Sequence, residues 1–532
     1  MPRWAVTEPN INLFLRDQPI RCQPAMGPAV GFKLSFKQRD EGGERSDVFN
    51  LSGGWNCNWL SWVDSQHMGS YGVLGNADVY LPGGGKLHFF WDSNQSSYAA
   101  DYYRNARLTP ILSGQNFVGY WLDLPDGRRY KYGQAWAATT PDRPRMMYLT
   151  ESHDSEGFIT RYAYTQTQHP DSLVLTLRLA TVSDHSNATL FTLGYLWKNN
   201  TEPFSALLST VTDRFGRTSQ LVPQLRTVTD AASLSSGVTY NANGWPATLT
   251  TPYGTTSFSY VSSQDGYNAL RRVDITEPNS GKQIYLFNAC GTSWGLPAEV
   301  PTGLRPSNLP SGTLLDFNAD LMNSFHWDQV QSVGIPADSS QITVNQLNKA
   351  RLRHWLHDSA EEYGVGPDLA LGYERSPSQN SEGSIAGQIT WYDYPGRSFS
   401  KVRGSQMAPS LIARKRPDGS TWYQAFGRNS WGLPTRRTET YGTSSPAATR
   451  THNFTYSGVD LTHVYRPGNE LVAYYTYNSR HQLLTQTLYP DAQYSYTTTY
   501  TYNDTYGRLT QVQHPTGLTT TYGPYNAYSG SY

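Results

Sequence analysis

Net charge, long hydrophobic runs and cysteine are all scarce in this sequence, and each scarcity excludes a class of protein. Lys and Arg together number 42, as do Asp and Glu, so the formal net charge is zero. Proteins that bind nucleic acid carry a basic face or an excess of positive charge, and anionic membranes select the same feature. The sequence therefore predicts no nucleic-acid partner and no attraction to an anionic membrane.

No run of about 18 apolar residues occurs, which argues against a membrane span. The first 30 residues lack the basic start and the apolar centre of a signal peptide. If the protein is exported, we expect another route or a leader that is missing here.

The three cysteines, Cys22, Cys57 and Cys290, lie far apart in the sequence. They form neither a CxxC pair nor a disulfide framework. We expect them to be buried, unreactive thiols.

Turn-forming residues and tyrosine are well represented. The 46 Gly and 32 Pro residues form about 15% of the chain, against a usual sum of about 12%. The 38 tyrosines outnumber the 18 phenylalanines. This composition favours an antiparallel all-β protein.

A repeated pattern fills the stretch from Phe454 to Tyr525. Each copy opens with aromatic residues that alternate with small polar ones, passes a turn, gives a short leucine-bearing strand and breaks at proline. The opening tyrosines Tyr456, Tyr477 and Tyr502 are 21 and 25 residues apart. Such a period equals one hairpin and is typical of a repeat architecture, in which each unit is stable only beside its neighbours.

The segment from Tyr500 to Gly523, YTYNDTYGRLTQVQHPTGLTTTYG, resembles the YD repeats of Rhs proteins. The bacterial pattern is roughly Y-x-Y-[ND]-x-x-G-R-L, then P-x-G, then Y. The two preceding copies are looser, with His481 in place of glycine and Ala492 after Pro-Asp. The repeat-defining residues are Tyr477, Tyr502, Gly507, Arg508, Leu509, Pro515 and Gly517.

The resemblance implies a fold and a function. We expect repeated antiparallel hairpins that form one curled, continuous sheet, a partial β-cage, with one inserted α-helix. In the family such a shell encloses a C-terminal polymorphic toxin for secretion or contact-dependent competition, so a toxin domain or other cargo is the implied partner. We expect a secreted or cell-surface location. Nothing here resembles the DPxGR core that closes the family's array, so we expect an unclosed segment with an exposed C-terminal edge.

Four regions follow from the pattern. Residues 1–150 form a β-rich region that leads into the repeats, residues 151–341 hold degenerate repeats such as Val238–Tyr260, and residues 364–532 hold the clearer copies. Between them, residues 342–363 predict the helix. Leu352, Trp355, Leu356 and Ala360 fall at i, i+3, i+4 and i+8, and Asn345 is placed to cap the start. We expect Leu352, Trp355 and Leu356 to be buried together.

Trp55, Trp59 and Trp62 are close together in the sequence and suggest two interpretations. We favour core aromatics, but three tryptophans are also typical of a platform that stacks on sugars. The second interpretation supports an alternative function, a cell-surface adhesin or carbohydrate-binding repeat protein.

Catalytic and metal motifs are absent from the sequence. His354 and His357 are followed by Glu361 and Glu362, but their spacing does not match zinc helices with His at i and i+4. No nucleophile elbow, phosphate-binding loop or calcium loop occurs. Acids such as Asp316 and Asp320 leave a glycosidase-like enzyme as a third hypothesis, because remote strands can bring two carboxylates together. We expect no enzyme activity, catalytic residue, cofactor or bound metal.

Overall fold

The computed structural model describes residues 2–24, 27–39, 51, 54–65, 75–114, 116–140, 143–168, 175–197, 206–222, 225–263, 270–290, 295–358, 366–442, 448–503 and 507–523. Their regular structure is almost entirely β-strand, as the sequence predicts. The strands form a main sheet of 32 strands, a sheet of four strands and a two-stranded ribbon.

The four-stranded sheet is N-terminal and contains β1 (Arg3–Thr7), β2 (Asn12–Cys22), β3 (Val30–Lys37) and β4 (Trp55–Cys57). The next short strands are β5 (Trp62–Asp64), β6 (Ala77–Tyr80) and β7 (Lys86–Phe89), followed by the ribbon of β8 (Trp91–Asp92) and β9 (Ser97–Tyr98). β5 pairs with the middle of β13, so this small hairpin unit joins the main sheet as a branch.

The first half of the main sheet contains β10 (Arg107–Ser113), β11 (Asn116–Asp123), β12 (Arg129–Thr140), β13 (Arg143–His153), β14 (Ile159–Gln168), β15 (Leu175–Ser183), β16 (Thr189–Trp197), β17 (Ala206–Asp213), β18 (Thr218–Leu221), β19 (Thr227–Thr229), β20 (Ser235–Tyr240), β21 (Pro246–Thr251), β22 (Gly254–Ser263), β23 (Leu270–Thr276) and β24 (Lys282–Cys290). The second half contains β25 (Leu321–Trp327), β26 (Arg351–His357), β27 (Pro367–Arg375), β28 (Ile389–Asp393), β29 (Leu411–Lys415), β30 (Thr421–Arg428), β31 (Pro434–Tyr441), β32 (Ala448–Ser457), β33 (Asp460–Arg466), β34 (Glu470–Tyr477), β35 (Leu483–Leu488), β36 (Tyr496–Tyr502), β37 (Leu509–Gln513) and β38 (Thr519–Thr521). The described helices are two 3-10 turns, η4 (Thr302–Leu304) and η5 (Ser339–Gln341), and α1 (Val344–Lys349).

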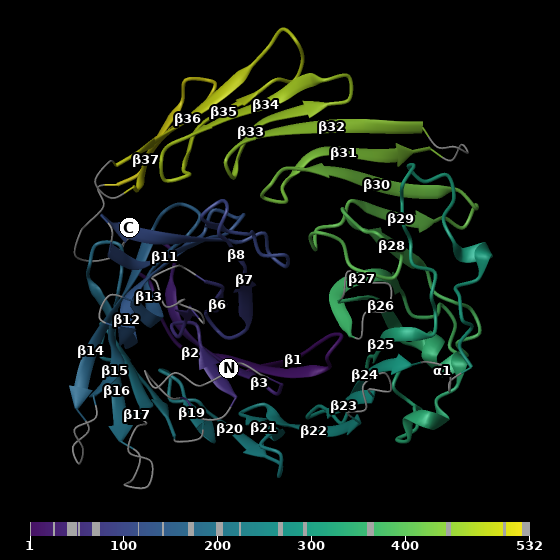
Figure 1. The fold of residues 1–532 in the computed structure, drawn as a ribbon, viewed down its shortest axis with the longest axis horizontal. Helices are drawn as coiled ribbons and strands as arrows, with labels where there is room; N and C mark the ends of the chain where they lie inside the picture. The colour runs from purple at the N-terminus through teal and green to yellow at the C-terminus, as the bar shows by residue number, and fades with distance from the viewer. Residues whose placement is uncertain are drawn as a thin grey trace.

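From β10 to β38, each strand pairs antiparallel with the next strand in the chain. Figure 1 shows the result, a sheet that curls around a ring until its C-terminal hairpins return to the side where β11 lies. No pairing joins β10 to β38 within the described residues, so the sheet is curled but not closed. Tyr477, Tyr502 and Leu509 lie in β34, β36 and β37, which confirms the prediction that these repeat positions are in strands.

One turn geometry recurs between the hairpin strands. In the β34–β35 turn, Oδ1 of Asn478 accepts hydrogen bonds from the backbone N–H groups of Arg480 (2.9 Å) and Gln482 (3.1 Å). The N–H of His481 donates to the carbonyl of Asn478 (3.1 Å), and His481 has φ of 61°. Asp or Asn therefore organises the turn, and the fourth position requires a left-handed backbone, which glycine adopts most easily. The same turn begins at Asp154, Asp184, Asp213, Asp230, Asn241 and Asn429.

Tyrosine has a specific role in the repeat. The hydroxyl of Tyr502 donates to the carbonyl of Leu483 (3.0 Å), one strand back, and that of Tyr456 donates to the carbonyl of Pro434 (3.1 Å). Tyr164, Tyr195 and Tyr260 make the equivalent bond to Leu149, Leu179 and Pro246. A phenylalanine cannot make this bond, which accounts for the excess of tyrosine at these positions.

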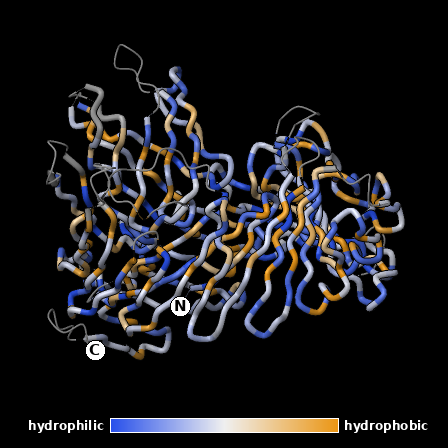
Figure 2. The backbone as a smooth tube through the Cα atoms, turned by 90° about the horizontal axis from the view of Figure 1, so that it is seen from below, coloured by the Kyte–Doolittle hydropathy of each residue, from blue (hydrophilic) through white to orange (hydrophobic). Residues whose placement is uncertain are grey.

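The wall has additional layers over part of its length. On the inside, the N-terminal sheet packs against the strands that follow β10, and together they form the largest hydrophobic cluster. On the outside, the segments 295–320 and 328–350 cover β24 to β29, with Leu347 packed in a second cluster that includes Trp327 of β25. In Figure 2 hydrophobic and hydrophilic positions alternate along the hairpin strands, as expected for strands with two different faces.

The helix prediction was correct in kind but wrong in extent. Only residues 344–349 are helical, capped by Thr343, whereas Leu352, Trp355 and Leu356 lie in strand β26. All three are buried, but in three separate clusters. Trp355 and Leu356 are consecutive and point to opposite faces of the strand, and the pairing register shifts between His354 and Trp355. Both faces of β26 are covered, so apolar residues fall on both and the alternation is lost. Ala360 lies outside the described residues.

Candidate functional site inside the ring

The N-terminal sheet lies inside the ring, where Figure 1 shows β1, β2 and β3 surrounded by the wall. Leu13, Leu15 and Ile20 of β2 and Phe32 and Leu34 of β3 are buried in the largest hydrophobic cluster. This apolar face attaches the sheet to the wall. The opposite face of β1 to β3 is turned away from the cluster.

A second attachment is polar and involves Glu8, at the turn between β1 and β2. Its carboxylate is 2% exposed and accepts bonds from Arg351 (2.5 Å) and Arg353 (2.8 Å) of β26. The hydroxyl of Ser324 also donates to it (2.6 Å). Three hydrogen-bond donors offset the cost of burying the charged Glu8 carboxylate. This contact therefore fixes the tip of the N-terminal sheet against the far wall.

A pocket lies between the free face of this sheet and the β6–β7 turn. It has a volume of about 640 Å³, and the residues around it include Arg3, Arg16, Lys33, Ser35 and Gly83. The hydroxyl of Ser35 donates to the carbonyl of Gly83 (2.8 Å), which joins the two sides of the pocket.

Two sets of contacts bring the ends of the ring together. Near β10, the guanidinium carbon of Arg107 lies 3.7 Å from the ring centroid of Trp431, and the same group donates to the hydroxyl of Ser430 (2.9 Å). Further along, a Cβ on Gly157 would be 3.2 Å from Cβ of Arg480, so the β13–β14 turn packs on the β34–β35 turn. Side chains and turns thus complete a ring that backbone pairing does not close.

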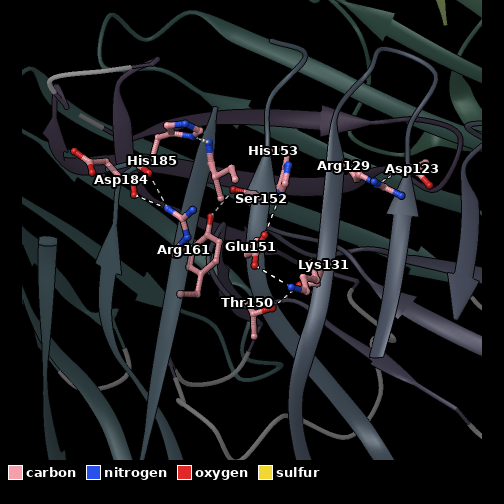
Figure 3. A network of polar contacts seen from close by, with 12 residues as sticks. Asp123, Arg129, Lys131, Thr150, Glu151, Ser152, His153, Arg161, Asp184 and His185 are labelled. Carbon is pink, nitrogen blue, oxygen red and sulfur yellow. Dashed lines mark hydrogen bonds and ion pairs between the residues drawn. The ribbon is translucent and has the colours of Figure 1, made fainter. Parts of the chain in front are cut away.

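The wall also carries a ladder of polar contacts across β11 to β16, shown in Figure 3. Glu151 accepts from Lys131 (3.0 Å) and lies 2.9 Å from Nε2 of His153. The hydrogen bond from His153, opposed by burial and assisted by Lys131, lowers the pKa of Glu151 to about 2. Arg161 donates to the carbonyls of Asp184 and His185. These groups bond to one another across neighbouring strands and therefore stabilise the wall.

The three sequence-predicted tryptophans are buried. Trp59 is fully buried between Phe32 and Phe191, with ring centroids 5.0 and 5.1 Å away. Trp62 stacks on Tyr80 at 4.4 Å, and the indole N–H of Trp55 donates to the hydroxyl of Tyr240 (2.8 Å). Their rings contact protein rather than solvent, so they do not form the exposed platform that the carbohydrate alternative requires.

The C-terminal repeat-defining residues lie at turns and strand starts. Gly507 has φ of 69°, and a Cβ there would lie 2.5 Å from Nη1 of Arg480. Its carbonyl accepts from the side chain of Gln482 (2.7 Å), one hairpin back. Gly507 therefore permits both the turn and close stacking of consecutive hairpins. Pro515 and Gly517 form the exposed β37–β38 turn, Leu509 begins β37, and Arg508 immediately precedes it.

His354 lies in the core and contacts an acid. It is 2% exposed, stacks on Tyr373, and its Nε2 lies 3.1 Å from Oδ2 of Asp316. Burial raises the pKa of Asp316, but the hydrogen bond and charge of His354 outweigh it, and the net pKa is lowered. Glu361 and Glu362 lie outside the described residues. Within the described part, no group of three or more His, Cys, Asp or Glu side chains is arranged to hold a metal.

Two further predictions concern cysteine and the membrane. Cys22 and Cys57 are free and buried, as expected, and burial raises the pKa of both thiols, that of Cys57 to about 12. The side chain of Cys290 lies outside the described residues. None of the helices described here is long and apolar enough to cross a membrane.

Comparison with known proteins gives structural matches alone. No protein-family model matches the sequence, and no curated protein is significantly similar to it. The chain is similar to a chain of the Tc holotoxin pore of Photorhabdus luminescens, at 10% identity and a TM-score of 0.33, over 94% of this chain and 25% of that one. It is similar to a TcdB2–TccC3 structure at 10% identity and a TM-score of 0.25, over 96% of this chain and 28% of that one.

A third similar structure is the N-terminal domain of the effector SpvB of Salmonella typhimurium, at 13% identity and a TM-score of 0.21, over 47% of this chain and 95% of that one. The chain spans about a quarter of the length of the two toxin chains. These TM-scores are low, so the similarity carries no functional argument by itself.

Proposed function

We propose that this chain is a segment of an Rhs-type shell that surrounds another polypeptide. The observation that carries the proposal is that the curled sheet already holds a folded part of its own chain inside the ring. A sheet made of hairpins that pair in order can lengthen by adding units, so its enclosed space grows with the number of repeats. The YD-like repeats of residues 454–525 support the same function.

In this proposal the enclosed partner is a toxin domain or comparable cargo, the complete gene product is secreted, and the shell segment has no catalytic role. The ionisable groups described above support the last point, because Glu151, Asp316 and His354 bond within the wall or core. The buried tryptophans favour the shell over the carbohydrate-binding alternative.

Limited proteolysis of the complete gene product, followed by mass spectrometry, tests the proposal. We expect a polypeptide outside residues 1–532, in the same or a co-purifying chain, to resist cleavage while the ring is intact. Arg107→Glu removes the contact with Trp431 and Ser430, so it should open the ring and expose that polypeptide. Arg104→Glu, at a neighbouring exposed arginine, is the matched control and should leave protection unchanged. Absence of any such polypeptide, or equal cleavage in both variants and wild type, overturns the proposal.

A further inference from the structure

The free face of the N-terminal sheet is positively charged. Arg16 of β2 and Lys33 of β3 are exposed and alternate with residues of the buried face, and Arg3 of β1 lies directly opposite Arg16. Cations that face each other across two strands repel one another and destabilise the pair. The Arg16 guanidinium also lies 5.5 Å from the ring centroid of Phe14, on the same face.

These cations differ from several arginines elsewhere in the described residues. No ion pair to Arg3, Arg16 or Lys33 is present among the described residues, whereas Arg272, Arg353, Arg397 and Arg403 each contact a carboxylate. The acid that the described part contributes to this pocket is Asp17, which is 8% exposed and accepts from the backbone N–H of Gln18. The pocket is therefore a concave surface with a net positive charge.

The dimensions and location restrict the occupant. A pocket of about 640 Å³ is larger than a single small anion occupies and can hold several side chains of a peptide. The pocket lies inside the ring, where the proposed function places a polypeptide, and the chain has no net positive charge to attract nucleic acid. Arginine forms paired hydrogen bonds with carboxylates, so glutamate and aspartate side chains complement this surface.

We propose that the pocket between β1–β3 and the β6–β7 turn binds an acidic peptide segment of the enclosed polypeptide. The inference rests on the proposed shell function and adds the contact by which the shell holds its cargo. Arg3 and Arg16 bind carboxylates together, which relieves their mutual repulsion, and Lys33 contributes a third positive charge.

Two measurements test the inference, and the first uses the intact chain. In fluorescence anisotropy, a labelled decapeptide of alternating Glu and Ala should bind, and matched Gln/Ala and Lys/Ala peptides should not. The combined change Arg16→Gln and Lys33→Gln should weaken binding by roughly tenfold or more, because each removes a charge-assisted contact. Arg214→Gln removes an exposed arginine at the β17–β18 turn and should change nothing. Equal binding of all three peptides, no binding at all, or tighter binding of an oligonucleotide or inorganic phosphate overturns the inference.

The second measurement uses the complete gene product and a carbodiimide, which joins a lysine to a carboxylate in direct contact. We expect a cross-link from Lys33 to an Asp or Glu outside residues 1–532. If the cargo is protected from protease but Lys33 forms no such link, the shell proposal stands and the peptide site is wrong. If no cargo is protected, the shell proposal itself fails.

Discussion

The wall from β10 to β29 and the wall from β30 to β38 are built from the same hairpins but have different sources of stability. The first has a layer on its inner or outer side, and together with these layers it contains nearly all of the buried apolar side chains of the described residues. In the second, the buried apolar residues of the described part are Ala473 and Val512. The later wall is therefore a single layer, although its repeats match the consensus best.

The single-layered wall depends on cross-strand bonds, which the layered wall has in addition to its core. Threonine hydroxyls pair across strands at Thr438 and Thr451 (2.9 Å), and at Thr476 and Thr485 (2.6 Å). Such pairs contribute about 0.2–1 kcal/mol each. Together with the tyrosine bonds and the Asp or Asn turns, they join each hairpin only to the hairpins next to it in the chain. The comparison teaches that a repeat consensus records local hairpin stability, whereas degenerate copies are tolerated where a second layer provides a core.

The largest effect that would distinguish the two regions is loss of a core tryptophan. We expect Trp59→Ala to lower the free energy of unfolding by about 3–5 kcal/mol, because it leaves a cavity between Phe32 and Phe191. Trp422→Ala, on a half-buried ring in β30, should cost clearly less. Urea unfolding followed by circular dichroism measures both. Equal losses would show that the single-layered wall has a core of its own.

Loss of the Glu8 contact, which attaches the inner layer, should have the next largest effect on the free energy of unfolding. Glu8→Ala leaves Arg351 and Arg353 without their shared carboxylate, and we expect a loss of about 2–4 kcal/mol. Hydrogen exchange should rise in β1 and β2 and remain unchanged in β34 and β35. Exchange that rises equally in both regions would mean that the N-terminal sheet also stabilises the single-layered wall.

Acid should affect the two regions differently. The folded pKa of Glu151 is about 2, below its unfolded value, so its contribution is present above about pH 4.5 and is lost as the pH falls toward 2. Glu151→Gln should remove a pH-dependent stabilisation on the order of 2 kcal/mol. Glu470 also has a lowered pKa through Arg466, but the pair is exposed and screened by solvent. Melting temperatures between pH 2 and pH 6 should therefore become flatter in Glu151→Gln and stay unchanged in Glu470→Gln.

The smallest effect concerns the turn that both regions share. Asn241→Ala and Asn478→Ala each remove a side chain that accepts two backbone hydrogen bonds. Each change should lower the local stability of its hairpin by about 1 kcal/mol. In the layered wall the loss should lower the urea midpoint of global unfolding. In the single-layered wall it should increase hydrogen exchange in β34 and β35 without moving that midpoint. Identical behaviour of the two variants would contradict the division into regions.

The sequence was sufficient for the parts of the fold that depend on neighbouring residues. Tyr502, Gly507 and Asn478 act within one or two hairpins, so their spacing predicted strands, turns and consecutive pairing. Strand β26 was mistaken for a helix because layers from distant parts of the chain cover both of its faces.

The sequence could not predict that the N-terminal sheet lies inside the ring, because its position depends on contacts between residues that are far apart in the sequence. Glu8 and Arg351 are 343 residues apart, and neither has a local motif. The basic pocket has the same origin, since Arg3, Arg16 and Lys33 are ordinary strand residues until β1 to β3 pair. The one available signal was the alternation of charged and apolar residues in β2 and β3.

The order of pairing has a consequence for synthesis on the ribosome. Because each strand of the wall pairs with the one made just before it, hairpins can dock as they emerge, and the ring can grow at the pace of translation. The Glu8 contact is different, since Glu8 must wait for Arg351, which is made 343 residues later. The segment around Glu8 therefore reaches its final place long after it has been synthesised.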